Sequence, residues 1–74
     1  MSKKPERISI SWVVNIESKK PYDVLTIETF VEEADALLYA NTYAEGHGGV
    51  KQKKRVWRLP EDSQFLIVRK KWNL

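Results

Sequence analysis

Apolar and polar residues alternate along the chain from Ile8 to Ile16. A period of two places the apolar side chains on one side of an extended backbone and predicts a strand with one buried face. The apolar row consists of Ile8, Ile10, Trp12, Val14 and Ile16. Residues 17–21 have the composition of a turn, and a β-favouring run from Tyr22 to Ile27 follows. We therefore expect the two strands to pair as an antiparallel hairpin.

A helix is predicted after this hairpin. Thr29 and Glu32 have the spacing of a capping box, in which both side chains satisfy backbone N–H groups of the first helical turn. Gly46 stands where a left-handed cap is favoured, so we expect the helix to end at about Glu45. An apolar stripe at helical spacing should face the sheet. Its members are Phe30, Ala34, Leu37, Leu38, Asn41 and Ala44, with Val31 at the edge.

Two further strands are predicted after the helix. Val50–Leu59 mixes long basic side chains with Val56 and Trp57, residues 60–63 have turn composition, and Gln64–Trp72 is typical of a closing strand. The element order is then ββαββ. This order fits an α+β fold with an antiparallel or mixed sheet and one helix packed on one face.

The length of 74 residues suits one small domain near the lower size limit. We expect residues 1–7 to be a flexible N-terminal tail and residues 8–74 to be that domain. The absence of cysteine excludes disulfides, a thiol nucleophile and the usual zinc ligands. No apolar run reaches the ~20 residues of a membrane-spanning helix. The N-terminal residues have no apolar core of a secretory signal, so we expect an intracellular, cytoplasmic protein.

Charge is distributed unevenly along the chain. Residues 1–50 contain five basic and eight acidic side chains, whereas residues 51–74 contain eight basic and two acidic ones. The formal net charge of the chain is +3. A folded molecule with this distribution has a dipolar surface, and its basic pole attracts polyanions or an acidic protein surface.

The sequence lacks the residues that catalysis usually requires. Acid–base and nucleophilic catalysis need a base close to its partner in a pocket, and His47 is the only histidine, in a glycine-rich loop where we expect it to be exposed. The run Gly46–Gly49 follows a helix, whereas phosphate loops precede one, so we interpret it as a cap and turn. Acidic residues near the helix start complement the helix dipole; they are Glu28, Glu32, Glu33 and Asp35. We expect a binding protein and not an enzyme, without cofactor or metal.

The basic segment near the C-terminus is the strongest functional signal. If one face of the sheet is free of the helix, strand alternation brings basic and aromatic side chains together there, as on surfaces that bind single-stranded nucleic acid. The candidate binding residues are Lys51, Lys53, Lys54, Arg55, Trp57, Arg58, Arg69, Lys70, Lys71 and Trp72. The competing interpretation is that the lysines protect a sheet edge against aggregation while the tryptophans belong to the core.

A second candidate surface lies on the predicted helix. Tyr39 and Tyr43 are four residues apart and project from the side opposite the apolar stripe. Because tyrosine is enriched at binding hot spots, we favour a protein interface here. Partial burial of the two rings against a neighbouring loop is the alternative.

Three segments occur in a suggestive order: a strand at Trp12–Ser18, a second strand and a Thr-led helix with a Glu-Ala pair at Val24–Ala34, and a basic run ending in proline at Arg55–Pro60. This order resembles the small T7-type phage inhibitor of bacterial RNA polymerase. The resemblance spans residues 12–60. It implies that Arg55 and Arg58 contact the polymerase.

Together these patterns predict a small regulatory protein that binds nucleic acid, DNA or RNA, through a basic and aromatic β-surface. The alternative is an inhibitor or adaptor, phage-encoded and acting in the host cytoplasm, that sets its basic edge or Tyr39 and Tyr43 against an acidic protein surface. A monomer and a homodimer joined through a strand edge both fit the sequence. We expect no membrane partner.

Overall fold

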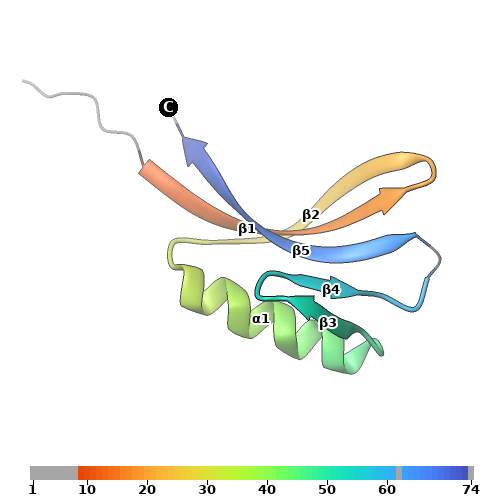
Figure 1. Cartoon of the computed structure of the whole chain (residues 1–74). Coiled ribbons are helices and arrows are strands. Elements are labelled where there is room, and N and C mark those ends of the chain that lie inside the picture. The colour runs from red at the N-terminus through yellow and green to blue at the C-terminus, as the bar shows by residue number, and fades with distance from the viewer. Residues whose placement is uncertain (1–8, 62, 74) are drawn as a thin grey trace, which may run out of the picture.

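The computed structural model of the protein describes residues 9–61 and 63–73 (Figure 1). The elements are β1 (Ser9–Lys19), β2 (Tyr22–Phe30), α1 (Glu33–Gly46), β3 (Val50–Lys53), β4 (Val56–Arg58) and β5 (Gln64–Asn73). The strands form one antiparallel sheet in the order β2-β1-β5-β4-β3, and α1 lies on one face. The α+β class is confirmed, but the element order is ββαβββ and not ββαββ. The predicted tail 1–7 and Ile8 lie outside the described residues.

The long strands β1 and β5 form the centre of the sheet. They pair without interruption from Ser9 opposite Asn73 to Ser18 opposite Gln64. The apolar row of β1 faces the helix as predicted: Val14 is fully buried, while Trp12 and Ile16 pack against the same hydrophobic cluster. The opposite side of the central strand is buried as well, since Val13, Asn15 and Glu17 are all buried, so alternation identified the face that meets the helix but not the burial of the other face.

The β1–β2 hairpin is confirmed and is longer than predicted. Its turn contains a cis Lys20–Pro21 bond, and β2 continues to Phe30 instead of ending at Ile27. Thr29 consequently lies in the sheet opposite Val13. The predicted capping box is wrong, because Glu32 is the N-cap of α1 and no side chain caps the helix. Strand pairing has overridden the local capping signal.

A row of alanines forms the buried face of α1, namely Ala36, Ala40 and Ala44. The predicted stripe is correct for Ala44 and for the partly buried Leu37, and wrong for Leu38, whose exposed fraction is 67%. Two further stripe residues that are exposed are Ala34 and Asn41. Small side chains let the helix approach the sheet closely, so the sheet supplies the large core residues.

The helix ends at Gly46, and His47 caps it with a backbone N–H that donates to the carbonyls of Tyr43 and Ala44 at 3.1 Å. The left-handed residue is Gly48 with φ 75°, and not Gly46 as predicted. The Gly49 amide then donates to the carbonyl of Ala44 at 2.7 Å. The chain thus turns tightly into β3.

The predicted strand 50–59 is two strands. β3 and β4 form a hairpin around Lys54 and Arg55, with Val50 opposite Arg58 and Lys53 opposite Val56. Neither turn residue has a positive φ, so the turn needs no glycine or asparagine to mark it. The closing strand is confirmed at Gln64–Asn73. In the described part of the chain, no helix is long and apolar enough to cross a membrane.

Candidate nucleic-acid interface

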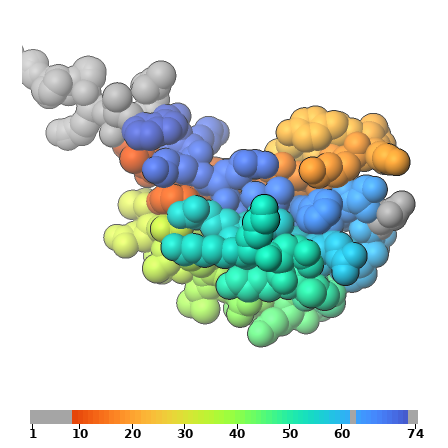
Figure 2. Space-filling model, viewed as in Figure 1, coloured from red at the N-terminus to blue at the C-terminus, as the bar shows by residue number. Residues whose placement is uncertain are grey.

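The sheet face opposite α1, called the helix-free face below, is not covered by the helix (Figure 1). Side chains that are directly opposite each other on neighbouring strands share a face. Glu17 lies opposite Phe65, and Phe65 lies opposite Arg58, so these three side chains lie on the same face. Figure 2 shows that this side is hollowed between the end of β5 and the tip of the β1–β2 hairpin. The face is therefore concave.

Positive charge is concentrated on the helix-free face. The registers place five cations there, from four strands: Lys19, Lys53, Arg58, Arg69 and Lys71. Among the described strand residues, Glu17 is the one carboxylate on this face. The other two strand acids, Asp23 and Glu28, lie opposite Ser18 and Val14 and so belong to the helix side. The strand registers therefore place most of the described strand acids on the helix side and five of the strand cations on the opposite face.

The single carboxylate of this face is buried and neutralised. The Glu17 side chain has an exposed fraction of 4%, whereas that of Arg69 is 56%. Arg69 donates two hydrogen bonds to Glu17, from Nε to Oε2 at 2.5 Å and from Nη2 to Oε1 at 2.9 Å. The hydrogen bond from Arg69 lowers the pKa of Glu17, although burial alone would raise it. The same bond raises the pKa of Arg69.

A polar chain continues from Glu17 toward β2. Asn15, which is also buried, donates to Oε2 of Glu17 at 3.4 Å. Thr26 donates its hydroxyl to the Asn15 Oδ1 at 2.6 Å. The carboxylate is thus held from both sides, and it fixes the Arg69 guanidinium in the middle of the face.

Two aromatic residues belong to the helix-free face. Phe65 is half-buried, and the Lys19 ammonium lies 5.4 Å from its ring centroid. Tyr22 lies opposite Lys19 at the tip of the hairpin and has an exposed fraction of 72%. Basic and aromatic side chains do meet on this face, but the aromatic residues are not the tryptophans that the sequence suggested.

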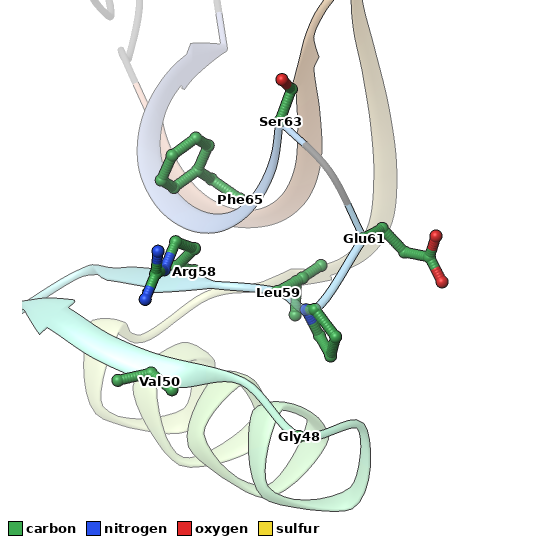
Figure 3. A pocket seen from close by; sticks show the side chains of 8 residues that line it. Gly48, Val50, Arg58, Leu59, Glu61, Ser63 and Phe65 are labelled. Atoms are coloured by element: carbon green, nitrogen blue, oxygen red, sulfur yellow. The ribbon is translucent and has the colours of Figure 1, made fainter.

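A pocket of about 300 Å³ opens beside Phe65 (Figure 3). Arg58 lies between Val50 and Phe65, while the Glu61 carboxylate points away from them. The lining residues are Gly48, Val50, Arg58, Leu59, Pro60, Glu61, Ser63 and Phe65. The walls combine polar and apolar groups, and the guanidinium and the aromatic ring among them suit a flat ring that carries a nearby negative charge.

The predicted binding residues separate into three groups. Those on the helix-free face are Lys53, Arg58, Arg69 and Lys71. Those on the helix side or in the β3–β4 turn are Lys51, Lys54, Arg55, Lys70 and Trp72. The last residue, Trp57, has an exposed fraction of 2% and belongs to the core. A stacking role for Trp57 is therefore corrected, because its ring cannot reach a ligand.

Arg55 is neutralised by the helix. Its Nε donates to the Glu33 carboxylate at 2.6 Å, and Nη2 forms an ion pair with the same group. The guanidinium also lies 5.2 Å from the centroid of the Trp12 ring. Glu33 is far from Arg55 in sequence, so only the fold reveals this pair. The fold thus places Arg55 against the helix and apart from the cations of the helix-free face.

The predicted tyrosine surface on α1 is wrong in its orientation. Tyr39 and Tyr43 are half-buried and pack against the hydrophobic core instead of projecting away from it. They belong to a row of rings with centroid distances of 5.5 Å from Phe30 to Tyr39, 6.4 Å between the tyrosines and 4.1 Å from Tyr43 to His47. This matches the alternative of partial burial. His47 is exposed, as predicted.

Sequence reasoning missed three residues of the helix-free face: Lys19, Tyr22 and Phe65. Lys19 and Tyr22 flank the hairpin turn, where composition alone indicates only a loop. Strand alternation does place Lys19 on this face, because Lys19 lies two residues after Glu17 in β1 and its side chain therefore points to the same side. Phe65 follows from the same rule once β5 is paired with β1.

Among the described residues, no group of three His, Asp or Glu side chains is placed to hold a metal ion. No known family is indicated. No protein-family model matches the chain, and comparisons with curated proteins and with solved structures found no significant match. The resemblance to the phage inhibitor therefore stays a prediction.

Proposed function

We propose that the protein is a non-catalytic regulatory factor that binds single-stranded nucleic acid on its helix-free face. The observation that carries the proposal is the separation of charge. Among the described strand residues, five cations share this face with a single carboxylate, and that carboxylate is buried and paired with Arg69. A concave surface with this charge attracts the phosphates of a flexible strand.

The proposal gives each side chain a role. Lys19, Lys53, Arg58 and Lys71 bind phosphates, and Phe65 stacks on a base. The pocket beside Phe65 has room for a flat ring, and Arg58 at its edge supplies a charge for the adjoining phosphate. Arg69 contributes a guanidinium that Glu17 already holds in place, so less rotamer entropy is lost on binding.

A single strand fits this surface better than a duplex read by a helix. Recognition helices place basic residues in the major groove. The first turn of α1 carries Glu33 and Asp35, and its last turn carries no basic residue. The helix would therefore repel the phosphates that flank a groove. A ligand site on the sheet avoids this repulsion.

Two neighbouring lysines of β5 provide the test, because they point to opposite faces. Lys71 lies on the helix-free face, while Lys70 lies on the other side. We expect Lys71→Gln to weaken binding of fluorescein-labelled oligouridine or oligothymidine several-fold. The slope of log affinity against log salt should fall by about 0.7, the value for one lost contact to a single strand. Lys70→Gln should leave both quantities unchanged. Fluorescence anisotropy at several salt concentrations measures them.

Equal effects of the two substitutions would refute the proposal, as would affinity that does not change with salt. A pull-down from bacterial lysate with and without nuclease separates the other class of function. A protein partner that stays bound after digestion supports an inhibitor or adaptor, in line with the phage-inhibitor resemblance.

A further inference from the structure

β5 is much longer than its neighbour β4. The three residues of β4 pair only with Phe65, Leu66 and Ile67 of β5. One more bond follows, in which the Val68 amide donates to the Arg55 carbonyl at 2.9 Å. From Arg69 to Asn73, β5 has β1 on one side and, within the described residues, no strand on the other. The sheet therefore has a notch at this edge (Figure 1).

Backbone groups in the notch follow from strand alternation. The Val68 amide and the Gln64 carbonyl both point toward β4. Because the backbone of a strand alternates with a period of two, Lys70 and Trp72 point their N–H and C=O groups to the same side. There they meet no partner strand within the described part of the chain. Arg69 and Lys71 direct theirs toward β1.

A groove of about 410 Å³ borders this edge. Its lining residues are Trp12, Arg55, Val56, Ile67, Val68, Arg69 and Lys70. In the groove the Arg55 guanidinium lies 5.2 Å and the Lys70 ammonium 5.6 Å from the centroid of the Trp12 ring. Beyond the groove, the Lys70 ammonium also lies 5.6 Å from the centroid of the Trp72 ring. Trp72 is 56% exposed. The edge thus offers apolar contact and positive charge together.

We propose that the Lys70–Trp72 edge accepts an extended acidic segment of another protein as an additional strand. Main-chain bonds to Lys70 and Trp72 would provide affinity, and Asp or Glu side chains at every second position, which share one face of an extended segment, would meet Lys70. This inference goes beyond the proposed function, since it concerns a strand edge and depends on Lys70, whereas nucleic acid depends on Lys71.

The positive charge of this edge favours an acidic segment over a second copy of the chain. Two copies joined antiparallel through this edge would bring like charges together in either register: Lys71 lies opposite Lys71 when Lys70 pairs with Trp72, and Lys71 lies opposite Arg69 when Lys70 pairs with Lys70. Like charges directly opposite one another destabilise a strand pair. An acidic partner instead neutralises the lysines that otherwise protect the edge.

The probe is a capped peptide in which Glu alternates with Thr, added to the full chain. In the free protein, we expect the Lys70 and Trp72 amides to exchange with solvent rapidly, while those of Arg69 and Lys71 are protected by β1. With saturating peptide, exchange at Lys70 and Trp72 should slow by at least about ten-fold. NMR-detected hydrogen exchange measures all four amides at once.

Two matched controls make the result decisive. The same peptide with N-methyl groups on its Glu residues, whose N–H groups face β5 when Glu lies opposite Lys70, cannot complete the ladder, so it should lose binding. Lys70→Gln should weaken the peptide and leave oligonucleotide affinity unchanged. The proposal is overturned by unchanged binding of the methylated peptide, by binding that does not protect Lys70 and Trp72, or by no binding at millimolar peptide. Protection in the free protein that grows with concentration, together with a dimer in sedimentation, would assign the edge to a second copy.

Discussion

At the scale of single residues, Glu17 is the least solvent-exposed charged residue among those that the structure describes. Its exposed fraction is 3%, while its partner Arg69 remains more than half exposed. The two groups are therefore not equivalent. A guanidinium that loses its partner can be solvated where it stands, whereas a carboxylate that loses its partner stays desolvated.

We expect Arg69→Gln to lower the free energy of unfolding more than Glu17→Gln does. The first change leaves a buried carboxylate without its cation and should cost about 2–3 kcal/mol, because hydrogen bonds to charged groups contribute that much. The second leaves only a half-exposed cation and should cost about 1 kcal/mol. Urea unfolding of the three proteins checks the order. The reverse order would show that Glu17 is solvated in solution.

The Glu17–Arg69 pair should also make the free energy of unfolding depend on pH in the acid range. The pKa of Glu17 is lowered in the folded protein, so the pair contributes its full stability above the unfolded-state value of about 4.3. That contribution disappears as the pH falls through the lowered pKa of the folded state. In Glu17→Gln, the loss of stability below pH ~4.5 should therefore be smaller than in the unsubstituted chain. Unfolding midpoints measured from pH 7 to pH 3 test this, and parallel curves would contradict it.

At the scale of elements, the alanine face of α1 sets how closely the helix lies on the sheet. Ala36 and Ala40 are fully buried against Val14 and Leu66. The large ring of Trp57 belongs to the same buried cluster and fills space between the helix and the sheet. Added volume on this helix face has nowhere to go, because a well-packed interior does not expand without strain.

Ala40→Leu should lower the free energy of unfolding by about 1–3 kcal/mol, the usual cost of overpacking a core. The matched control is Ala34→Leu, which makes the same change at an exposed position of the same helix. It should change stability by less than about 0.5 kcal/mol. Thermal unfolding followed by circular dichroism compares the two. A similar loss in both variants would mean that leucine acts through helix propensity and not through packing.

The local sequence pattern predicted the elements that have a clear hydrophobic period. It failed where tertiary contacts determine the secondary structure or the packing. The alternation in β1 located Val14 in the core, and the turn at Pro21 located the hairpin. The capping signal of Thr29 failed because pairing with Val13 keeps that residue in a strand. The helix stripe failed because Ala40 is a weak hydrophobic signal, yet its small size is what the packed face requires.

The candidate site was predictable in its charge but not in its geometry. A basic segment that contains Lys70 and Lys71 is evident in the sequence, whereas their division between two faces depends on the register with β1. The Lys54–Arg55 turn carries no glycine, so the β3–β4 hairpin gave no signal, and the competing interpretation that the tryptophans belong to the core is correct for Trp57 and not for the exposed Trp72. The pairing of Arg69 with Glu17 joins distant parts of the chain and needs the fold itself.

At the scale of the whole molecule, the fold sorts charge by face. Acidic side chains gather on and beside α1, and the strands present cations on the opposite side. Approach of a polyanion is therefore oriented before contact, since the acidic first turn of α1 repels it and the helix-free face attracts it. Association rates with oligonucleotides should fall with rising salt through the same field.

The first and last described residues lie side by side, since Ser9 stands opposite Asn73. Paired strands place their Cα atoms about 5 Å apart, so a short glycine-serine segment replacing residues 1–8 and 74 spans the gap. Backbone cyclisation of this kind restricts the unfolded chain and leaves the sheet unchanged. We expect it to raise stability by about 2–4 kcal/mol over a linear chain of the same composition, measured by thermal unfolding. An unchanged midpoint would indicate that the two ends lie apart in solution. The cyclised protein would also have no chain ends for exopeptidases to attack.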